Sequence, residues 1–226
     1  MSNALIKLGT EYGGWHLPKT MLIDGIEIAV CVGAGEDISY DLILSAFCKR
    51  VFVFDPTPKA VIHVGCTLMN LLSGNAMHSS PDGVLYNRVP HCTSSIIFYP
   101  LGLHGSDTVI EFYPPPQSSY ASYSTENIQN TVNPIILPVI GPDSLMRLIS
   151  SETPDILELD IEGAEEPFLK ALVTSRLRPK ILQVEFDMLL TGDQQGTGQL
   201  IKSILDIGYT IIHRDGRNMV FFLEDE

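Results

Sequence analysis

Four groups of residues in this 226-residue chain could bind a ligand or move a proton, and each directly follows an apolar run or lies at its end. The first is Gly33-Ala34-Gly35, which comes after the run from Ile26 to Val32. Missing side chains let the backbone turn tightly and let a ligand approach it. Because a GxG pair alone is a weak signal, it indicates a site only together with its neighbours.

The second group is Asp55, which follows the next apolar run and lies twenty residues after Gly35. A carboxylate in this place can accept hydrogen bonds from both hydroxyls of a ribose. A dinucleotide fingerprint needs a third glycine at position 38, where Ile38 stands, so a nucleoside without a pyrophosphate fits better. The alternative is that Asp55 only forms a turn before Pro56.

The third group is the segment from Glu158 to Glu166, which carries five acids in nine residues. Strand alternation would place Glu158, Asp160 and Glu162 on one side, which is costly in a buried strand unless each carboxylate has a partner. We therefore expect Asp160 and Glu162 to belong to a site. Glu165 and Glu166 are expected in the first turn of the next helix, where the helix dipole favours negative charge.

The fourth group is Glu185-Phe186-Asp187, at the end of another apolar run. Together with Asp160, these acids could provide a general base or hold a hard cation such as Mg²⁺. We favour the base, with Asp160 as the first candidate and Glu162 or Asp187 as alternatives, because apolar surroundings raise a carboxyl pKa into a useful range. The histidines lack zinc-binding spacing, so no metal ligand is assigned.

These groups need strands that end at a common edge, and the pattern of the chain predicts such elements. Apolar runs alternate with helical periodicity, which predicts an α/β fold with a doubly wound, mostly parallel, Rossmann-like sheet. A terminal antiparallel hairpin is expected to pair Tyr209–His213 with Met219–Leu223. The length fits a single domain over residues 1–226. The Pro- and Tyr-rich segment 114–125 is expected to be irregular, as either a binding loop or a disordered connector.

Net charge and composition limit the classes of ligand and partner that the chain can bind. The 14 Lys and Arg residues against 27 Asp and Glu residues give a net charge of −13, which disfavours nucleic acid and anionic membranes as ligands. A small-molecule substrate is expected instead. With no apolar run long enough to span a membrane, no signal-peptide pattern and no CxxC pair, we expect a cytoplasmic protein with reduced thiols. The oligomeric state stays open.

Three stretches resemble the FkbM-type S-adenosylmethionine-dependent methyltransferases: VGAGEDISYD at 32–41, FDPTP at 54–58 and LDIEGAE at 159–165. The resemblance extends from about Gly9 to the terminal hairpin and implies a class I methyltransferase fold. It also implies that S-adenosyl-L-methionine is the cofactor, with its methionine part on Gly33, Ala34 and Gly35 and its ribose on Asp55. Asp160 and Glu162 would then border the reaction centre, and Asp160 is counted among both the cofactor-binding and the catalytic residues.

Two residues depart from the usual class I motif. Cys31 stands where an acid is common, and Asp37 stands where a third glycine is usual. We expect Glu36 or Asp37 to pair with the ammonium of the methionine part, while the alternative for Asp37 is a helix cap before Ile38. Trp15, in a segment that also resembles the family, would lie near the pocket mouth or simply pack in the core.

The favoured function is therefore O-methylation of a small-molecule or sugar hydroxyl. Two alternatives remain, a nicotinamide-dependent oxidoreductase and a non-catalytic α/β binding protein derived from a methyltransferase. No Walker motif or GxSxG elbow occurs, which removes the usual signatures of phosphate binding and acyl transfer.

Overall fold

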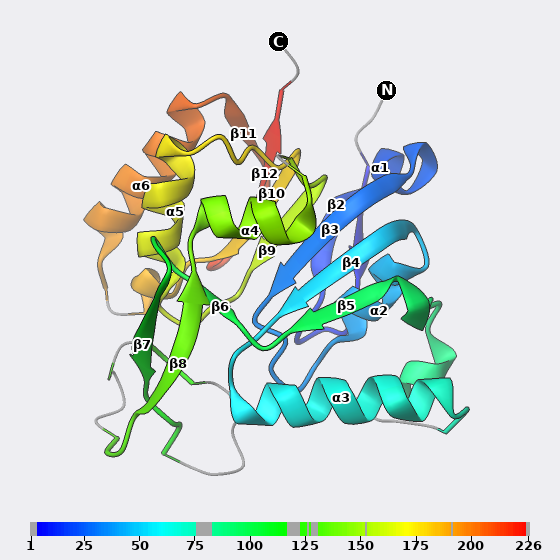
Figure 1. Ribbon diagram of the computed structural model, residues 1–226. Helices are drawn as coiled ribbons and strands as arrows, with labels where there is room; N and C mark the ends of the chain where they lie inside the picture. The colour runs from blue at the N-terminus through cyan, green and yellow to red at the C-terminus, as the bar shows by residue number, and fades with distance from the viewer. Residues whose placement is uncertain are drawn as a thin grey trace. The chain divides into compact units, whose positions relative to one another are not determined.

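The computed structural model describes residues 4–75, 83–116, 123–125, 127, 131–151, 153–190 and 192–224. The chain divides into two compact units, Met1–Pro100 and Leu101–Glu226, and both combine strands with helices (Figure 1). The expected α/β class is therefore confirmed. A single domain over residues 1–226 stays a prediction, and the units are described one by one.

The first unit has a parallel arrangement of β3, β4 and β5, in that order. Residues in β3 and β4 are mostly buried, as in the register pair Val30 and Phe52, which explains why these segments are continuous apolar runs. The elements of this unit are β1 (Leu5–Leu8), β2 (Trp15–Pro18), α1 (Lys19–Asp24), β3 (Ile26–Val32), α2 (Ser39–Ser45), β4 (Cys48–Phe54), α3 (Pro58–Leu72), the short 3-10 helices η1 (Tyr86–Arg88) and η2 (Thr93–Ser95), and β5 (Ile96–Tyr99).

The helices of the first unit begin where the sequence favours it. α3 starts with Pro58, whose fixed backbone angle and missing N–H suit the first position of a helix. α2 packs against β4 and β5. The β1–β2 hairpin was not expected from the sequence, and its residue Trp15 is 6% exposed, within the core of the unit.

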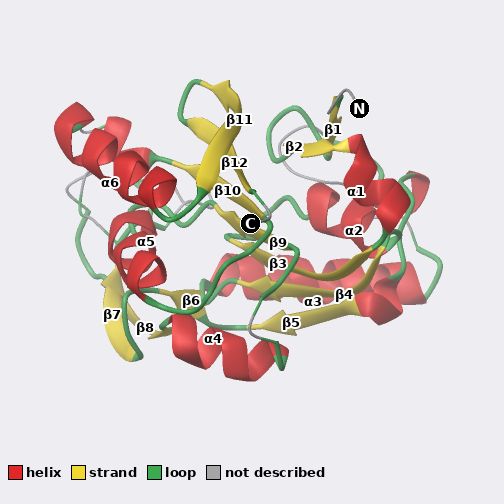
Figure 2. Cartoon of the chain, turned by 90° about the horizontal axis from the view of Figure 1, so that it is seen from above, coloured by secondary structure: helices red, strands yellow, loops and turns green. Residues whose placement is uncertain are grey.

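The second unit contains the strand order β11-β12-β10-β9. β9 and β10 are parallel, while β12 runs antiparallel to β10 and pairs with β11, so the predicted terminal hairpin is confirmed. Helices α5 and α6 pack against each other (Figure 2). The elements are β6 (Gly102–Leu103), β7 (Thr108–Phe112), β8 (Ile135–Ile140), α4 (Pro142–Ile149), β9 (Ile156–Leu159), α5 (Glu165–Thr174), β10 (Ile181–Glu185), the 3-10 helix η3 (Asp187–Leu189), α6 (Gln194–Asp206), β11 (Tyr209–Asp215) and β12 (Asn218–Leu223).

A separate small sheet in the second unit has the order β6-β8-β7. Its strand β8 was not expected, because alternating exposure and the internal Pro138 weaken the apolar pattern there. The irregular segment 114–125 lies next to this sheet in sequence, and Tyr113 forms an isolated antiparallel bridge with Ser124. Residues 117–122 lie outside the described residues, so the role of this segment stays a prediction.

The acid-rich segment differs from the expected strand alternation. β9 ends at Leu159, and Glu162 has a left-handed backbone with φ of 49°. The prediction that Glu158, Asp160 and Glu162 share one side of a strand is therefore wrong, because the extended conformation stops before Asp160. The prediction that Glu165 and Glu166 lie in the first turn of a helix is confirmed by α5.

Among the described residues, no helix is both long enough and apolar enough to cross a membrane.

Substituting alanine for two glycines of the first unit should change the free energy of unfolding in opposite directions. Gly65 lies inside α3 and a Cβ there would meet nothing within 4 Å, so Gly65→Ala should raise the free energy of unfolding by about 0.5–1 kcal/mol. A Cβ on Gly14 would lie 2.3 Å from the Thr10 carbonyl oxygen, so Gly14→Ala should lower it by about 1–3 kcal/mol. Urea denaturation of both variants measures these shifts, and changes of the same sign would contradict the assigned packing.

Candidate functional site

The glycine turn of the first unit follows β3 and is held at its start by β4. The N–H of Gly33 donates to the Phe54 carbonyl over 2.9 Å, and the N–H of Asp37 donates back to Ala34 over 3.2 Å. Gly33 and Gly35 have φ of 100° and 49°, values that glycine adopts without strain. A Cβ on Gly35 would meet nothing closer than the Gly33 carbonyl oxygen at 4.0 Å, so this side of the turn is open to a ligand.

Asp55 holds the same turn from the end of β4. One oxygen, Oδ2, accepts from the Gly35 N–H over 2.9 Å, while Oδ1 accepts from the N–H and hydroxyl of Thr57 over 2.8 and 2.7 Å. Burial raises the pKa of Asp55, and the bonds from Gly35 and Thr57 oppose that shift. Since a carboxylate has about four acceptor positions, roughly one stays free on Oδ2. The structure thus leaves room for one ligand hydroxyl on Asp55, where the sequence suggested two.

Glu36 and Asp37, the two acids after the glycine turn, differ in how many hydrogen bonds and ion pairs their carboxylates form. Both oxygens of Asp37 accept hydrogen bonds, Oδ2 from the Thr10 hydroxyl and Oδ1 from the N–H of Ser39. Asp37 therefore bonds the first residue of α2, although the cap residue of this helix is Ile38. Glu36 is partly exposed, and the ion pair recorded for it is a long one of 3.9 Å to Lys59. Of the two, Glu36 is the carboxylate that can still take a cationic ligand group.

A further acid under the turn carried no functional signal in the sequence. Asp41 lies in the first turn of α2, 5% exposed, and its Oδ1 has no hydrogen-bond partner among the described residues. Burial is the main cause that raises the pKa of Asp41 to about 7, and the charge of Asp37 adds to it. An amphipathic pattern cannot distinguish such a buried acid from a solvated one, because Asp in a first helical turn is favoured in both cases.

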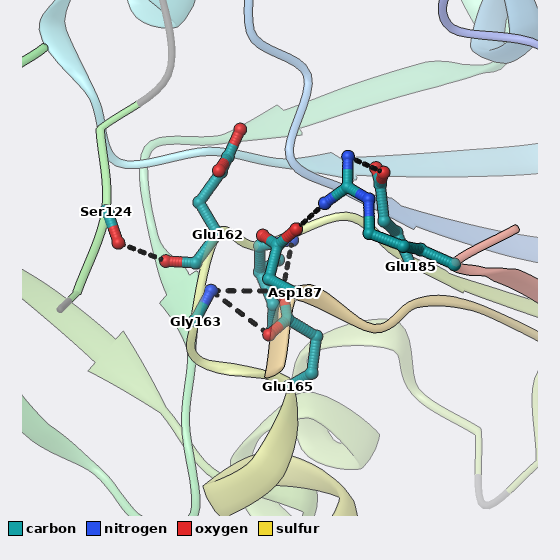
Figure 3. Close-up of polar contacts among 8 residues, drawn as sticks. Ser124, Glu162, Gly163, Glu165, Glu185 and Asp187 are labelled. Carbon is teal, nitrogen blue, oxygen red and sulfur yellow. Dashed lines mark hydrogen bonds and ion pairs between the residues drawn. The ribbon is translucent and has the colours of Figure 1, made fainter. Parts of the chain in front are cut away.

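The second unit has a turn of its own after β9, and Glu165 holds it. The carboxylate of Glu165 is wholly buried and accepts from the N–H groups of Ile161 over 3.1 Å and Gly163 over 3.0 Å (Figure 3). Burial raises the pKa of Glu165 to about 8, and the nearby charge of Asp187 acts in the same direction. Glu165 therefore stabilises the turn from inside, beyond the helix-dipole role expected for it.

Glu162 lies at the apex of this turn in a strained conformation. Its φ of 49° is left-handed, which is unfavourable for a residue with a Cβ, and such strain often occurs at functional sites. Its carbonyl accepts from the Ser124 hydroxyl over 2.9 Å and from the Thr125 N–H over 3.0 Å. The Glu162 carboxylate points away from the Glu165 and Asp187 carboxylates (Figure 3). It has no hydrogen bond or ion pair with any of the described residues.

Asp160 is bound to another acid. Its carboxyl group is hydrogen-bonded to that of Glu185, and such a bond requires one of the two groups to carry a proton. Burial raises the pKa of Asp160 well above its usual value, and the charges of Glu185, Glu158 and Glu162 raise it further. Burial also raises the pKa of Glu185, but the Arg217 charge and the bond from Asp160 oppose this. The pair therefore holds a proton, and the stronger rise of its pKa assigns this proton to Asp160.

Arg217 neutralises the remaining acids of the cluster. From the turn of the terminal hairpin its guanidinium contacts Glu185 over 2.5 Å and also pairs with Asp187, which is nearly buried. The sequence showed Arg217 only as part of a turn, because the contact with Asp187 spans 30 residues. Of the three candidate bases, Asp187 is thus paired with a cation, Asp160 is protonated, and Glu162 has the accessible carboxylate.

In the part of the chain that the structure describes, no three His, Cys, Asp or Glu side chains are grouped to hold a metal ion. The magnesium site considered for Asp160 and Asp187 therefore gains no support.

The first unit thus has a glycine turn with a strand-end carboxylate, and the second unit has a strained acid after a parallel strand; both arrangements are typical of α/β proteins. The Methyltransferase FkbM domain matches residues 27–211, so the chain belongs to the FkbM methyltransferase family. Among curated proteins none matches this chain.

One solved structure that the chain resembles is methyltransferase FkbM from Methylobacillus flagellatus KT, with 14% sequence identity and a TM-score of 0.48. The match covers 88% of this chain and 44% of that one, so the chain spans less than half the length of that protein.

The stability of the protein should fall as the pH rises from about 5 to 9. The folded-state pKa values of Glu165 and Asp41 lie near 8 and 7, above those of the unfolded chain, so folding favours their protonated forms. Each group then lowers the free energy of unfolding by up to about 1.4 kcal/mol per pH unit between its unfolded and folded pKa values. Glu165→Gln should flatten the profile measured by urea denaturation, whereas Glu166→Gln, on an exposed ion pair with Lys170, should leave it unchanged.

Glu162→Asn should stabilise the fold, because asparagine tolerates left-handed backbone better than glutamate. We expect the free energy of unfolding to rise by about 0.5–1 kcal/mol. Glu166→Asn, inside α5, is the matched control and should lower it slightly through poorer helix propensity. Loss of stability in Glu162→Asn would show that the carboxylate itself stabilises the turn.

Proposed function

We propose that this chain is an S-adenosyl-L-methionine-dependent methyltransferase that methylates a hydroxyl group of a small molecule such as a sugar. Membership of the FkbM family supports methyl transfer. The observation that carries the choice of cofactor is the turn at Gly35, which is open on one side and held by Asp55 through the Gly35 N–H. Such a turn suits a nucleoside ligand, because backbone and carboxylate can both contact it.

Different residues of the first unit would bind different parts of the cofactor. Asp55 Oδ2 keeps about one acceptor position for a ribose hydroxyl, and Glu36 has a carboxylate for the ammonium group. Ile38 is wholly buried where a dinucleotide site would have its third glycine, which argues against a nicotinamide cofactor. The cofactor, when bound, would supply an electrophilic methyl group.

The task of the chain is then to orient the acceptor hydroxyl and to take up its proton. Among the acids of the second unit we choose Glu162 as the proton acceptor, because its carboxylate has no hydrogen bond or ion pair with the described residues. Asp160, the first candidate from the sequence, is hydrogen-bonded to Glu185 and has a raised pKa, and Asp187 is paired with Arg217. A positioned carboxylate of this kind contributes roughly 10²–10⁴-fold to a rate.

A neutral or cationic small molecule is the acceptor that fits the charge of the chain. The net charge of −13 repels phosphate-rich acceptors such as nucleic acids. The guanidinium of Arg217 is already paired with Glu185 and Asp187, so it is not free to bind an anionic acceptor. The other acids near this pair would repel such an acceptor.

Calorimetric titration with S-adenosylhomocysteine tests the cofactor assignment. The parent protein should bind it, and NAD should give no heat of binding. In Asp55→Asn, an amide nitrogen replaces one of the two carboxylate oxygens, either Oδ2 on the Gly35 side or Oδ1 on the Thr57 side. The charge is lost in both cases, so the binding free energy should weaken by about 1.5–3 kcal/mol.

Asp24→Asn is the matched control, because Asp24 is exposed at the end of α1 and should leave affinity unchanged. Circular dichroism checks that both variants fold. Binding of NAD in place of S-adenosylhomocysteine would reject the methyltransferase proposal in favour of a dehydrogenase.

A further inference from the structure

The N-terminal residues before β2 pack onto the end of the glycine turn. The N–H of Thr10 donates to the Ser39 hydroxyl over 2.9 Å, and the Thr10 hydroxyl donates to Asp37 Oδ2 over 2.5 Å. The N–H of Ser39 in turn donates to Asp37 Oδ1 over 2.9 Å. Three residues from two segments of the chain thus form a closed ring of hydrogen bonds, and Thr10 and Ser39 are almost fully buried.

Close backbone packing accompanies this ring. The Thr10 hydroxyl also accepts from the Gly13 N–H over 2.9 Å, which folds residues 10–13 into a tight loop. A Cβ on Gly13 would lie 3.0 Å from Asp37 Oδ2, and one on Gly9 would lie 3.2 Å from the Ser39 hydroxyl oxygen. The glycines on both sides of Thr10 therefore let this segment approach Asp37 and Ser39.

Asp37 is anchored from a second direction. The Tyr86 hydroxyl, wholly buried, donates to Asp37 Oδ1 over 3.3 Å and accepts from the Ile38 N–H over 3.0 Å. His63 Nε2 lies 3.2 Å from the Tyr86 hydroxyl oxygen, and this distance fits the His63 tautomer whose Nε2–H donates to Tyr86. This network connects α3 and η1 with the end of the turn.

Glu36 therefore lies between two fixed neighbours. On one side Gly35 is held by Asp55, and on the other Asp37 is held by Thr10, Ser39 and Tyr86. A backbone fixed at both ends loses little further freedom when a ligand binds, which increases affinity.

We propose that the Thr10–Asp37 hydrogen bond is a latch by which the N-terminal segment fixes the glycine turn for its ligand. Thr10 and Asp37 are positioning residues, and neither needs to touch the ligand. This inference rests on the proposed function, because it takes S-adenosylmethionine as the ligand of the turn. It also gives Asp37 a role different from binding the methionine ammonium, which is left to Glu36.

Calorimetry with S-adenosylhomocysteine at a temperature well below unfolding tests the latch. Thr10→Val keeps the shape of the side chain and removes the hydroxyl, and we expect the dissociation constant to rise roughly tenfold. Thr10→Ser retains the hydroxyl and should bind within about threefold of the parent.

Thr67→Val is the matched control in the same unit. Thr67 on α3 is wholly buried and its hydroxyl has no partner among the described residues, so its loss should not weaken binding. If Thr10→Val does not fold, Asp37→Asn replaces it, because the amide oxygen can still accept from Ser39 while the amide nitrogen cannot accept from Thr10. The intrinsic fluorescence of Trp15 reports whether each variant keeps its folded core.

The outcomes separate the two proposals. No binding by the parent rejects the proposed function and the latch with it. Parent-like affinity in folded Thr10→Val overturns the latch alone. Weak binding in Asp37→Asn with normal binding in Thr10→Val would also overturn it, since Asp37 would then contact the ligand directly.

Discussion

Both units depend on a buried carboxylate that satisfies the backbone N–H groups of a turn after a parallel strand. Such a turn leaves donors without strand partners, and an unpaired buried N–H is costly. Asp55 accepts from Gly35 in the first unit, and Glu165 accepts from Ile161 and Gly163 in the second. Each acid thereby fixes the backbone of its turn from one side.

Using buried acids to bind these turns places several acids in apolar surroundings, and their charge is compensated differently in the two units. In the second unit Arg217 compensates Glu185 and Asp187, while Asp160 keeps its proton. In the first unit neutral groups donate to the acids, such as Thr57 to the buried Asp55 and Thr10 to the half-buried Asp37. Each unit therefore compensates its own carboxyl groups, the second with a proton and a guanidinium and the first with hydroxyl groups.

Sequence patterns could predict the buried strands β3, β4, β9 and β10, the terminal hairpin and the helix with acids in its first turn, because these depend on local periodicity and capping. They could not predict that Glu165 is buried, since an acid in a first helical turn looks the same whether it faces water or a neighbouring turn. Nor could they predict Arg217, whose partners come from a distant strand end. The alternation assumed through Glu162 failed because Gly163, with φ of 101°, continues a turn that begins right after β9.

The bonds from Ser124 and Thr125 to the Glu162 carbonyl have a consequence for how this domain can diversify. The segment that leaves β7 returns at Ser124, where it bridges to Tyr113 and grips the backbone of the strained acid. These contacts are made by described residues at the two ends of the segment. Exchanging residues between Tyr113 and Ser124 should therefore leave the bonds to the Glu162 carbonyl in place, so this part of the sequence can vary without moving the backbone of Glu162.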